Sequence, residues 1–218
     1  MKTLLAAALA LYISLFAVSS SFAQGQTKIR DYETARRQYF WNQLYDNGGR
    51  DLYCGVRFRK GQRLSVEHVY AADWIADKFG CENRDCNHPT YKFAEADLHN
   101  LWPALGAINS SRGKSFFGEI PDIKPRLPPS IADLKCSYKK LKDLVEPRRS
   151  VWGDIARSLF YMHVEYDLPL RAMLPVLKIW HRKDPPNNYE RWRNKRIFDL
   201  QGTRNRFIDT PKVADELE

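Results

Sequence analysis

The chain has 218 residues, with 35 lysines and arginines against 26 aspartates and glutamates, and a formal net charge of +9. Beyond residue 23 it has no apolar run long enough to cross a bilayer and no internal repeat, which excludes a multi-span membrane protein and a repeat array. The basic excess favours a polyanionic partner, meaning nucleic acid, anionic lipid or acidic polysaccharide, and does not choose among them.

Residues 1–23 have the pattern of a signal peptide. Lys2 is their only charge, an apolar run from Leu4 to Val18 follows, and small residues lead to Ala23. A membrane anchor is the alternative, but the apolar run is shorter than the roughly 20 residues that span a bilayer. We therefore expect export, with Gln24 as the first residue of the mature protein.

The spacing of apolar residues divides the rest of the chain into elements. Alternation of apolar and polar residues predicts a two-stranded hairpin from residues 52–58 and 63–68, and four prolines make 114–130 a long surface loop. Pro175 must begin or kink its helix, and the tail over 211–218 is expected to be disordered. Helices are predicted over residues 31–44, 71–79, 92–98, 153–166, 170–181 and 190–200.

Four cysteines in a chain that enters an oxidising compartment indicate two disulfides. Of the three possible pairings we favour Cys81 with Cys86, which closes a small loop, and Cys54 with Cys136, which ties the early strands to the later chain. A zinc site formed by Cys81, Cys86 and His88 is the alternative, and it has no evident fourth ligand.

Glu67 and His68 are adjacent at the end of the second predicted strand, where neighbouring side chains face opposite sides unless the chain twists. Hydrolysis of a phosphodiester needs a base for the attacking water and a cation for the phosphate charge. The carboxylate of Glu67 and the side-chain carbonyl of Asn100 are ligands that a hard cation prefers, with water filling the other positions. His68 would then stay off the metal and act as the base, although a lone strand histidine is more often an ordinary hydrogen-bonded residue.

Four nearby residues have two interpretations each. His99 is either a second base or metal ligand, or an outer residue that holds Asn100 in place. Asp97 is either another outer acceptor or a helix charge. Asn109 and Arg112 lie in a glycine-containing turn that either presents donors to phosphate or only stabilises the turn.

Cationic residues are dense near the carboxyl end and are interleaved with Trp192 and Phe207. Such a run either follows a nucleic-acid backbone through phosphate contacts, which weaken with salt, or is a solvated helix face. The residues are Arg191, Arg193, Lys195, Arg196, Arg204 and Arg206.

A set of motifs occurs in a fixed order: Tyr53-Cys54-Gly55, residues 66–69 and 97–103, Asn109 with 111–113, 153–157 with 160–162, 190–194 and 201–205. This ordered set, which runs through nearly all of the chain after residue 23, resembles the bacterial endonuclease I family. The resemblance implies a metal-binding core of two strands and a helix, the His-Me finger, within a single α+β, helix-rich domain over residues 24–210.

The resemblance also implies roles for individual residues. His68 would be the general base, and Glu67 and Asn100 would bind one divalent cation, with magnesium expected and calcium or manganese as alternatives. An arginine near the cysteine loop would contact the scissile phosphate, and Arg84 is the nearest match in a loop shorter than the family's usual one.

The resulting hypothesis is a monomeric endonuclease, periplasmic or secreted, that cuts DNA and RNA without sequence preference and leaves 5'-phosphates. We expect Arg112, Arg191, Arg193 and Arg204 to contact the nucleic acid. Two alternatives stay open: a secreted ribonuclease of the same fold, and a non-catalytic exported protein that binds nucleic acid.

Overall fold

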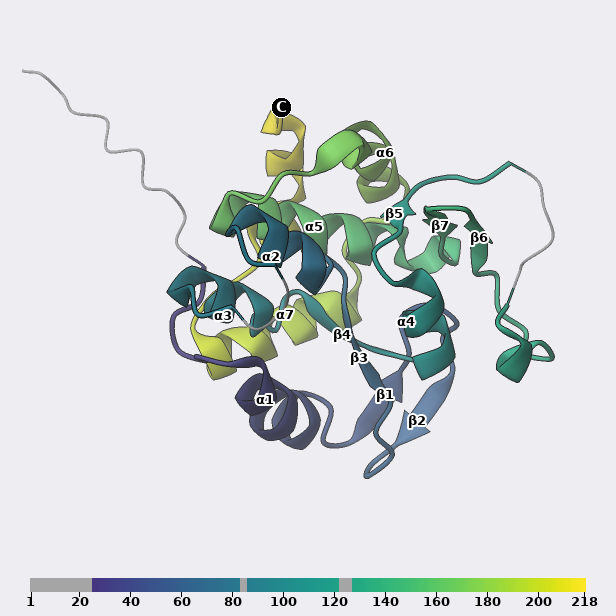
Figure 1. Ribbon diagram of the computed structural model, residues 1–218, viewed down its shortest axis with the longest axis horizontal. Coiled ribbons are helices and arrows are strands. Elements are labelled where there is room, and N and C mark those ends of the chain that lie inside the picture. The colour runs from purple at the N-terminus through teal and green to yellow at the C-terminus, as the bar shows by residue number, and fades with distance from the viewer. Residues whose placement is uncertain (1–24, 83–85, 122–126) are drawn as a thin grey trace, which may run out of the picture.

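The computed structural model describes residues 25–82, 86–121 and 127–218, so the predicted signal peptide lies outside the described residues. Within these ranges, helices form most of the regular structure, and two of the three small sheets, those within residues 48–59 and 116–146, lie toward the edge of the view (Figure 1). The predicted α+β, helix-rich class is therefore confirmed. None of the helices in the described ranges is long and apolar enough to span a membrane.

The first helical segment is capped by Asp31, whose carboxylate accepts a hydrogen bond from the Thr34 amide at 2.8 Å. Helix α1 (Tyr32–Thr34) continues as the π-helix η1 (Ala35–Leu44), so the predicted helix is confirmed although its wider turns were not foreseen. The apolar side of η1 packs with α7 in the smaller of two cores. Its buried members are Ala35, Phe40, Trp41 and Leu44.

Helix α5 (Trp152–Tyr166) lies in the middle of the larger core and ends at Asp167, which adopts a left-handed conformation with φ of +53°. Its predicted apolar face is fully formed, because Ile155, Leu159, Met162 and Tyr166 are all buried. Helix α6 (Leu174–Lys183) packs along α5 and carries Pro175 in its first turn, where a missing N–H costs nothing. The prediction that Pro175 begins this helix is confirmed.

The strands β3 (Ser65–His68) and β4 (Leu101–Ala104) form an antiparallel pair, and helix α4 (Gly106–Arg112) follows β4 directly (Figure 1). The chain leaves α4 at Gly113, whose φ of +53° favours glycine. The glycine-containing turn predicted around Asn109 is therefore wrong. The helix has only seven residues and buries Ile108 as its one apolar side chain, so it has no readable periodicity.

The predicted hairpin of residues 52–58 with 63–68 is also wrong. Strand β2 (Arg57–Arg59) pairs with β1 (Gly48–Arg50), and β3 pairs with the distant β4. The cause is Asp51, whose carboxylate accepts hydrogen bonds from the amides of Cys54 and Val56. These bonds hold the segment after β1 as a tight turn and not as a strand.

Two short helices connect β3 to β4. They are α2 (Ala72–Lys78) and α3 (Pro89–Glu95), and both were predicted, although α3 begins and ends about one turn earlier than expected. The third sheet places β5 (Phe116–Phe117) parallel to β7 (Leu144–Glu146), which pairs with β6 (Lys139–Leu141). The predicted loop over 114–130 thus contains a strand. Single helical turns complete the order: η2 (Pro129–Ile131), η3 (Arg149–Val151) and η4 (Arg171–Met173).

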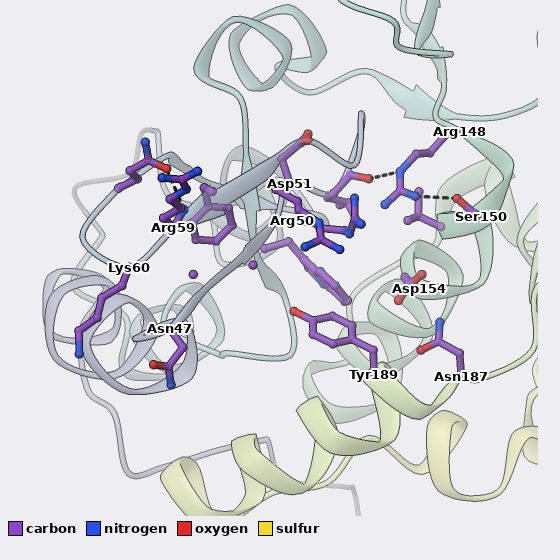
Figure 2. A pocket seen from close by; sticks show the side chains of 18 residues that line it. Asn47, Arg50, Asp51, Arg59, Lys60, Arg148, Ser150, Asp154, Asn187 and Tyr189 are labelled. Atoms are coloured by element: carbon purple, nitrogen blue, oxygen red, sulfur yellow. Dashed lines mark hydrogen bonds between the residues drawn. The ribbon is translucent and has the colours of Figure 1, made fainter.

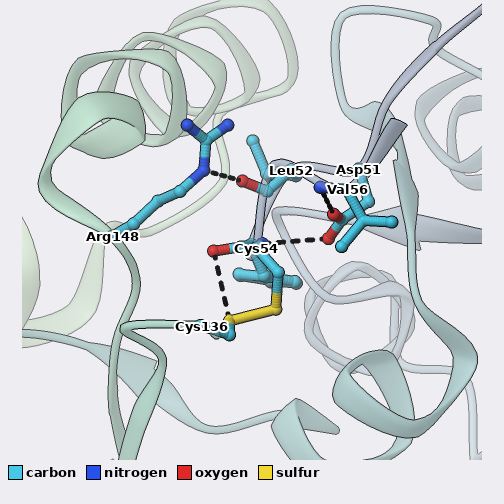
Figure 3. The surroundings of a disulfide bond; sticks show 7 residues. Asp51, Leu52, Cys54, Val56, Cys136 and Arg148 are labelled. Atoms are coloured by element: carbon cyan, nitrogen blue, oxygen red, sulfur yellow. Dashed lines mark hydrogen bonds between the residues drawn. A yellow bond between two sulfur atoms is a disulfide. The ribbon is translucent and has the colours of Figure 1, made fainter. Parts of the chain in front are cut away.

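Both predicted disulfides are present, and the zinc alternative is wrong because its two cysteines are bonded to each other. The Cys54–Cys136 bridge joins segments 82 residues apart in sequence. It lies beside Leu52, whose carbonyl accepts a hydrogen bond from Arg148 Nε at 3.0 Å (Figure 3). The bridge therefore fixes the turn after β1 to the later half of the chain.

The carboxyl-terminal region is mainly helical as far as Glu216. Helix α7 (Asn188–Gln201) begins with a capping box between Asn187 and Glu190, and α8 (Arg206–Asp209) follows. The disordered tail predicted over 211–218 is wrong, since η5 (Pro211–Glu216) packs on the protein with Ala214 buried. Two cations of α6 secure it: Lys178 donates to the Leu217 carbonyl at 2.6 Å, and Arg182 pairs with Asp215 at 2.6 Å.

Candidate active site

A cavity of about 560 Å³, named here the His68 cavity, lies between β3, α4 and residues of α1, α2 and α3. Glu67 and His68 both line it, so the two neighbours do reach one site. Asn109 of α4 also lines it. The cavity therefore combines a carboxylate, an imidazole and an amide from the strand pair and the helix that follows it.

Glu67 is 1% exposed and is held by two buried donors. The Tyr53 hydroxyl donates to Glu67 Oε1 at 2.6 Å, and Arg112 Nη1 lies 3.2 Å from the same oxygen. Burial raises the pKa of Tyr53 well above its usual value, and the Glu67 charge adds to this, so the hydroxyl stays protonated and keeps donating. A carboxylate fixed in this way has a defined direction at the wall of the cavity.

His68 is half-buried at the end of β3, with its ring 4.9 Å from that of Tyr32. Its Nε2 lies 2.9 Å from the carbonyl oxygen of Glu95, the last residue of α3. Because a carbonyl only accepts, Nε2 must carry the proton, and in the neutral ring the lone pair is on Nδ1. The contact thus selects the tautomer in which Nδ1 can take up a proton.

Asn109 is half-buried on α4 and turns its amide nitrogen toward β3. Nδ2 donates to Ser65 Oγ at 2.8 Å and to the Val66 carbonyl at 3.0 Å. These two acceptors leave the side-chain oxygen, Oδ1, as the atom available to a ligand. Sequence reasoning assigned this residue only turn or phosphate contacts, because the short helix over 106–112 that places it beside β3 leaves no readable pattern in the sequence.

Asn100, predicted as a metal ligand, does not line the His68 cavity. It is fully buried, and both ends of its amide bind the backbone of Tyr70: Oδ1 accepts from the amide at 2.6 Å and Nδ2 donates to the carbonyl at 2.9 Å. The Asn100 side chain therefore joins the start of β4 to the segment after β3. Its position is that of a structural residue, and the prediction is corrected.

A model of the endonuclease I family matches residues 17–212 of the chain. The chain belongs to the endonuclease I family. Endonuclease-1 of Buchnera aphidicola subsp. Acyrthosiphon pisum is 31% identical over 182 residues, which cover 78% of this chain and 70% of the relative. A periplasmic deoxyribonuclease of Aeromonas hydrophila is 32% identical over 174 residues, covering 72% of this chain and 69% of the relative.

A third relative is an extracellular ribonuclease of Bacillus amyloliquefaciens, 36% identical over 140 residues that cover 56% of this chain. The match spans 46% of that relative, less than half of its length. The family match and the relatives together identify the chain as an endonuclease and confirm the predicted resemblance.

Two further predicted residues of this endonuclease, Asp97 and His99, lie away from the His68 cavity in the turn before β4. Asp97 is fully buried and accepts hydrogen bonds from Gln201, Tyr161 and Tyr166. His99 Nε2 lies 3.0 Å from the Thr203 carbonyl. The His99 ring forms no hydrogen bond with Asn100 among the described residues, so the prediction that His99 holds Asn100 in place is wrong. Both side chains bind the carboxyl-terminal segment to the centre of the endonuclease.

Arg112 and Arg193, predicted to contact nucleic acid, are buried structural residues of this endonuclease. Arg112 donates to the carbonyls of His68 and Val69 at 2.9 and 2.7 Å and lies over the ring of Phe117. Arg193 donates to the carbonyls of Leu98 and Leu101 and lies 3.9 Å from the centre of the Trp102 ring. The Arg193 guanidinium is buried away from the His68 cavity, so that prediction is corrected. Arg112 also lines the His68 cavity, so its contact with nucleic acid stays a prediction.

The remaining predicted cations have different surroundings. Arg191 is exposed on α7 and donates to the Pro186 carbonyl at 2.6 Å. Arg204 is exposed but forms a two-point ion pair with Asp209. Neither lines the His68 cavity, and contact with nucleic acid stays a prediction for both. Arg84, predicted to bind the scissile phosphate, lies outside the described residues.

Proposed function

We propose that this endonuclease hydrolyses phosphodiester bonds of nucleic acid with one divalent cation and with His68 as general base. The observation that carries the proposal is the convergence of Glu67, His68 and Asn109 on one cavity. In the described parts of the chain, no three His, Cys, Asp or Glu side chains gather to hold a metal. The protein would thus offer one carboxylate and one amide oxygen, a set that suits a hard cation that keeps several waters.

The donor set fits magnesium, with calcium or manganese as alternatives, and the ligands we propose are Glu67 and Asn109. When bound, the cation supplies charge neutralisation at the phosphate and at the leaving oxygen. Tyr53 and Arg112 hold the Glu67 carboxylate in place. The strand pair β3–β4 with α4 would then be the metal-binding core that the resemblance implies.

The proton transfer falls to His68. With Nε2 donating to the Glu95 carbonyl, Nδ1 accepts a proton from the attacking water, and the carbonyl then stabilises the positive ring. A well-placed histidine base contributes about 10²–10⁴-fold to such a reaction. Arg84, as a ligand of the scissile phosphate, completes the proposed machinery.

The substrates we propose are DNA and RNA, cut without sequence preference to 5'-phosphate products. Support comes from relatives named deoxyribonuclease and ribonuclease. A dedicated ribonuclease is the second candidate, because the Bacillus relative is named as one. Initial rates on single-stranded RNA and on duplex DNA, measured under one condition, separate the two.

We further propose that the mature protein acts outside the cytoplasm, in the periplasm or beyond, after removal of residues 1–23, and that it is a monomer. The relatives named extracellular and periplasmic support export, and so do the two disulfides. Size-exclusion chromatography of the exported protein and sequencing of its amino terminus test both points.

The deciding experiment is the nicking of a supercoiled plasmid by the purified protein. We expect cleavage with magnesium and none with a chelator. His68→Ala should lower the rate by about 10²–10⁴-fold. The matched control is His163→Ala, whose ring binds the Leu168 carbonyl at 2.7 Å and does not line the His68 cavity; it should cut normally. Undiminished cutting by His68→Ala, with the chelator still inhibiting, would rule out the proposed base.

A further inference from the structure

A second and larger hollow, about 1060 Å³ in volume, lies between the β1–β2 hairpin and the first residues of α5 and α7 (Figure 2). We name it the arginine cleft after Arg50, Arg57, Arg59 and Arg148, which line it together with Lys60. None of its lining residues lines the His68 cavity. The proposed mechanism therefore makes no use of this cleft.

Three of these arginines share one face of the small β1–β2 sheet. Arg50 is directly opposite Arg57 in the strand register, and Arg59 lies two residues after Arg57, so their side chains point to the same side. Phe58, between them, points into the core. Like charges directly opposite each other destabilise a strand pair, so this arrangement favours an anion on that face.

Within the described residues, no acidic side chain neutralises this face. Arg50, Arg57 and Arg59 are exposed and form no ion pair there. Two acids border the cleft, but Asp51 is buried and its carboxylate binds the amides of Cys54 and Val56.

The second bordering acid, Asp154, is 4% exposed. Burial, followed by the nearby charge of Glu190, raises its pKa well above the usual value. The five cations that line the cleft, Arg50, Arg57, Arg59, Lys60 and Arg148, outnumber these two acids, so the cleft keeps a net positive charge.

The opposite side of the cleft carries a cation and an aromatic ring. Arg148 is oriented by hydrogen bonds from Nε to the Leu52 carbonyl and from Nη1 to Ser150 Oγ, at 3.0 and 2.7 Å (Figure 2). Tyr189 lines the cleft from α7, and its ring stacks on Trp192 with centroids 5.6 Å apart. These rings are 43% and 49% exposed, which is unusual for large aromatic residues.

We propose that the arginine cleft binds a single strand of nucleic acid outside the His68 cavity. The arginines would hold consecutive phosphates, and the Tyr189–Trp192 pair would stack a base at the mouth of the cleft, which is the usual combination in strand-binding proteins. As a role in substrate capture, the inference rests on the proposed function. The His68 cavity and the arginine cleft are connected through the β3–β4 strand pair. Glu67 of β3 lines the His68 cavity, and Trp102, the β4 residue paired with Glu67, lines the arginine cleft.

The first test measures binding of a labelled oligothymidylate, with a chelator present and with the oligonucleotide checked for integrity afterwards. The double variant Arg57→Gln/Arg59→Gln should raise Kd about tenfold or more at low salt. The slope of log Kd against log salt concentration should also fall by about 0.7 for each phosphate that the variant no longer neutralises. Trp192→Ala should weaken binding by about 5- to 100-fold, since base stacking contributes that much.

The matched control removes two exposed arginines that line neither hollow. Arg37→Gln/Arg182→Gln removes the same charge, and each of these arginines is already paired with a surface acid. This control should bind oligothymidylate like the wild type. If it weakens binding as much as the Arg57/Arg59 variant, the effect is one of net charge and the proposal is overturned. If the Arg57/Arg59 variant binds a blunt duplex of the same length as weakly, relative to the wild type, as it binds oligothymidylate, the assignment to single strands is overturned.

Cleavage kinetics separate this inference from the proposed function. With magnesium, the Arg57/Arg59 variant should show a raised KM on long single-stranded DNA and unchanged hydrolysis of a small chromogenic phosphodiester, which is too short to reach the cleft. Unchanged binding and KM in an active enzyme would overturn the cleft and leave the nuclease mechanism standing. If the wild type binds single strands through the cleft but cuts no substrate, the cleft would stand and the nuclease mechanism would be overturned.

Discussion

The turn over residues 97–100, before β4, and helix α4, after it, both bury polar side chains. In the turn, these side chains bind other parts of the protein at both ends: Asn100 binds the backbone of Tyr70, and Asp97 binds Gln201 and two tyrosines. In α4, Asn109 binds β3 through its amide nitrogen and lines the His68 cavity. Asn100 and Asn109 are both polar, but Asn100 is fully buried with both ends of its amide bound, whereas Asn109 is half-buried and lines a cavity.

This difference assigns separate roles to two asparagines nine positions apart. Asn100, whose amide is fully used by main-chain groups, contributes to stability, and Asn109, which lines the cavity, would contribute to the chemistry that we propose. Mutations in the turn before β4 should therefore change the free energy of unfolding, and mutations in α4 should change the rate of cleavage.

The largest effect is expected for Asn109→Ala. Loss of a proposed cation ligand should remove several kcal/mol of transition-state stabilisation, or about 10³-fold in kcat. The midpoint of thermal unfolding should change little, because the residue is half-buried at the cavity wall. Plasmid nicking at saturating magnesium and a thermal melt measure the two quantities. A variant with normal kcat would show that α4 supplies no ligand and would remove the contrast between the two regions.

The turn should instead determine stability at low pH, through His99. Burial, only partly opposed by the Asp97 charge, lowers the pKa of His99 from 6.5 to about 4. The unfolded chain therefore binds this proton first, so the stability contribution is complete above about pH 6.5 and disappears as the pH falls toward 4. The decrease is at most about 3 kcal/mol.

This expectation is measured as the free energy of unfolding in urea, for wild type and His99→Gln, at pH 7 and pH 4.5. Other groups titrate over the same range, so the difference between the two proteins is the informative quantity. We expect the wild type to lose more stability than the variant. Parallel losses would mean that His99 is protonated without cost in the folded state.

Sequence reasoning located most of the helices and the Glu67–His68 pair because their signals are local. Apolar spacing marks α5, and adjacent residues need no fold to be recognised as neighbours. The partner of β3 could not be predicted in this way, because β4 is distant in the chain and Asp51 stops residues 52–56 from being a strand. Without that pairing, sequence reasoning favours Asn100 as the ligand and Asn109 as a turn residue, and Arg112 and Arg193 cannot be separated from surface arginines.

Asn100→Ala should test the structural side of the comparison directly. The substitution leaves the buried amide of Tyr70 without an acceptor, which costs about 2 kcal/mol of unfolding free energy. Activity per folded molecule should be unchanged well below the unfolding midpoint. Urea unfolding and active-site-normalised nicking rates measure the two effects. A large loss of kcat with normal stability would return Asn100 to the catalytic machinery.

The smallest effect is expected for Tyr53→Phe, which removes only the hydroxyl that donates to Glu67 at 2.6 Å. Loss of a group that orients a metal ligand lowers metal affinity by about 10- to 100-fold, so the magnesium concentration for half-maximal cutting should rise while kcat at saturation stays near normal. Tyr138→Phe is the control, since its ring packs 5.7 Å from that of Tyr53 and its hydroxyl has no hydrogen-bond partner among the described residues. If both variants need the same extra magnesium, ring packing and not the hydrogen bond positions Glu67. If only Tyr53→Phe needs extra magnesium, the Tyr53 hydroxyl, which lies outside the cavity, sets the cation affinity by holding the Glu67 carboxylate in place.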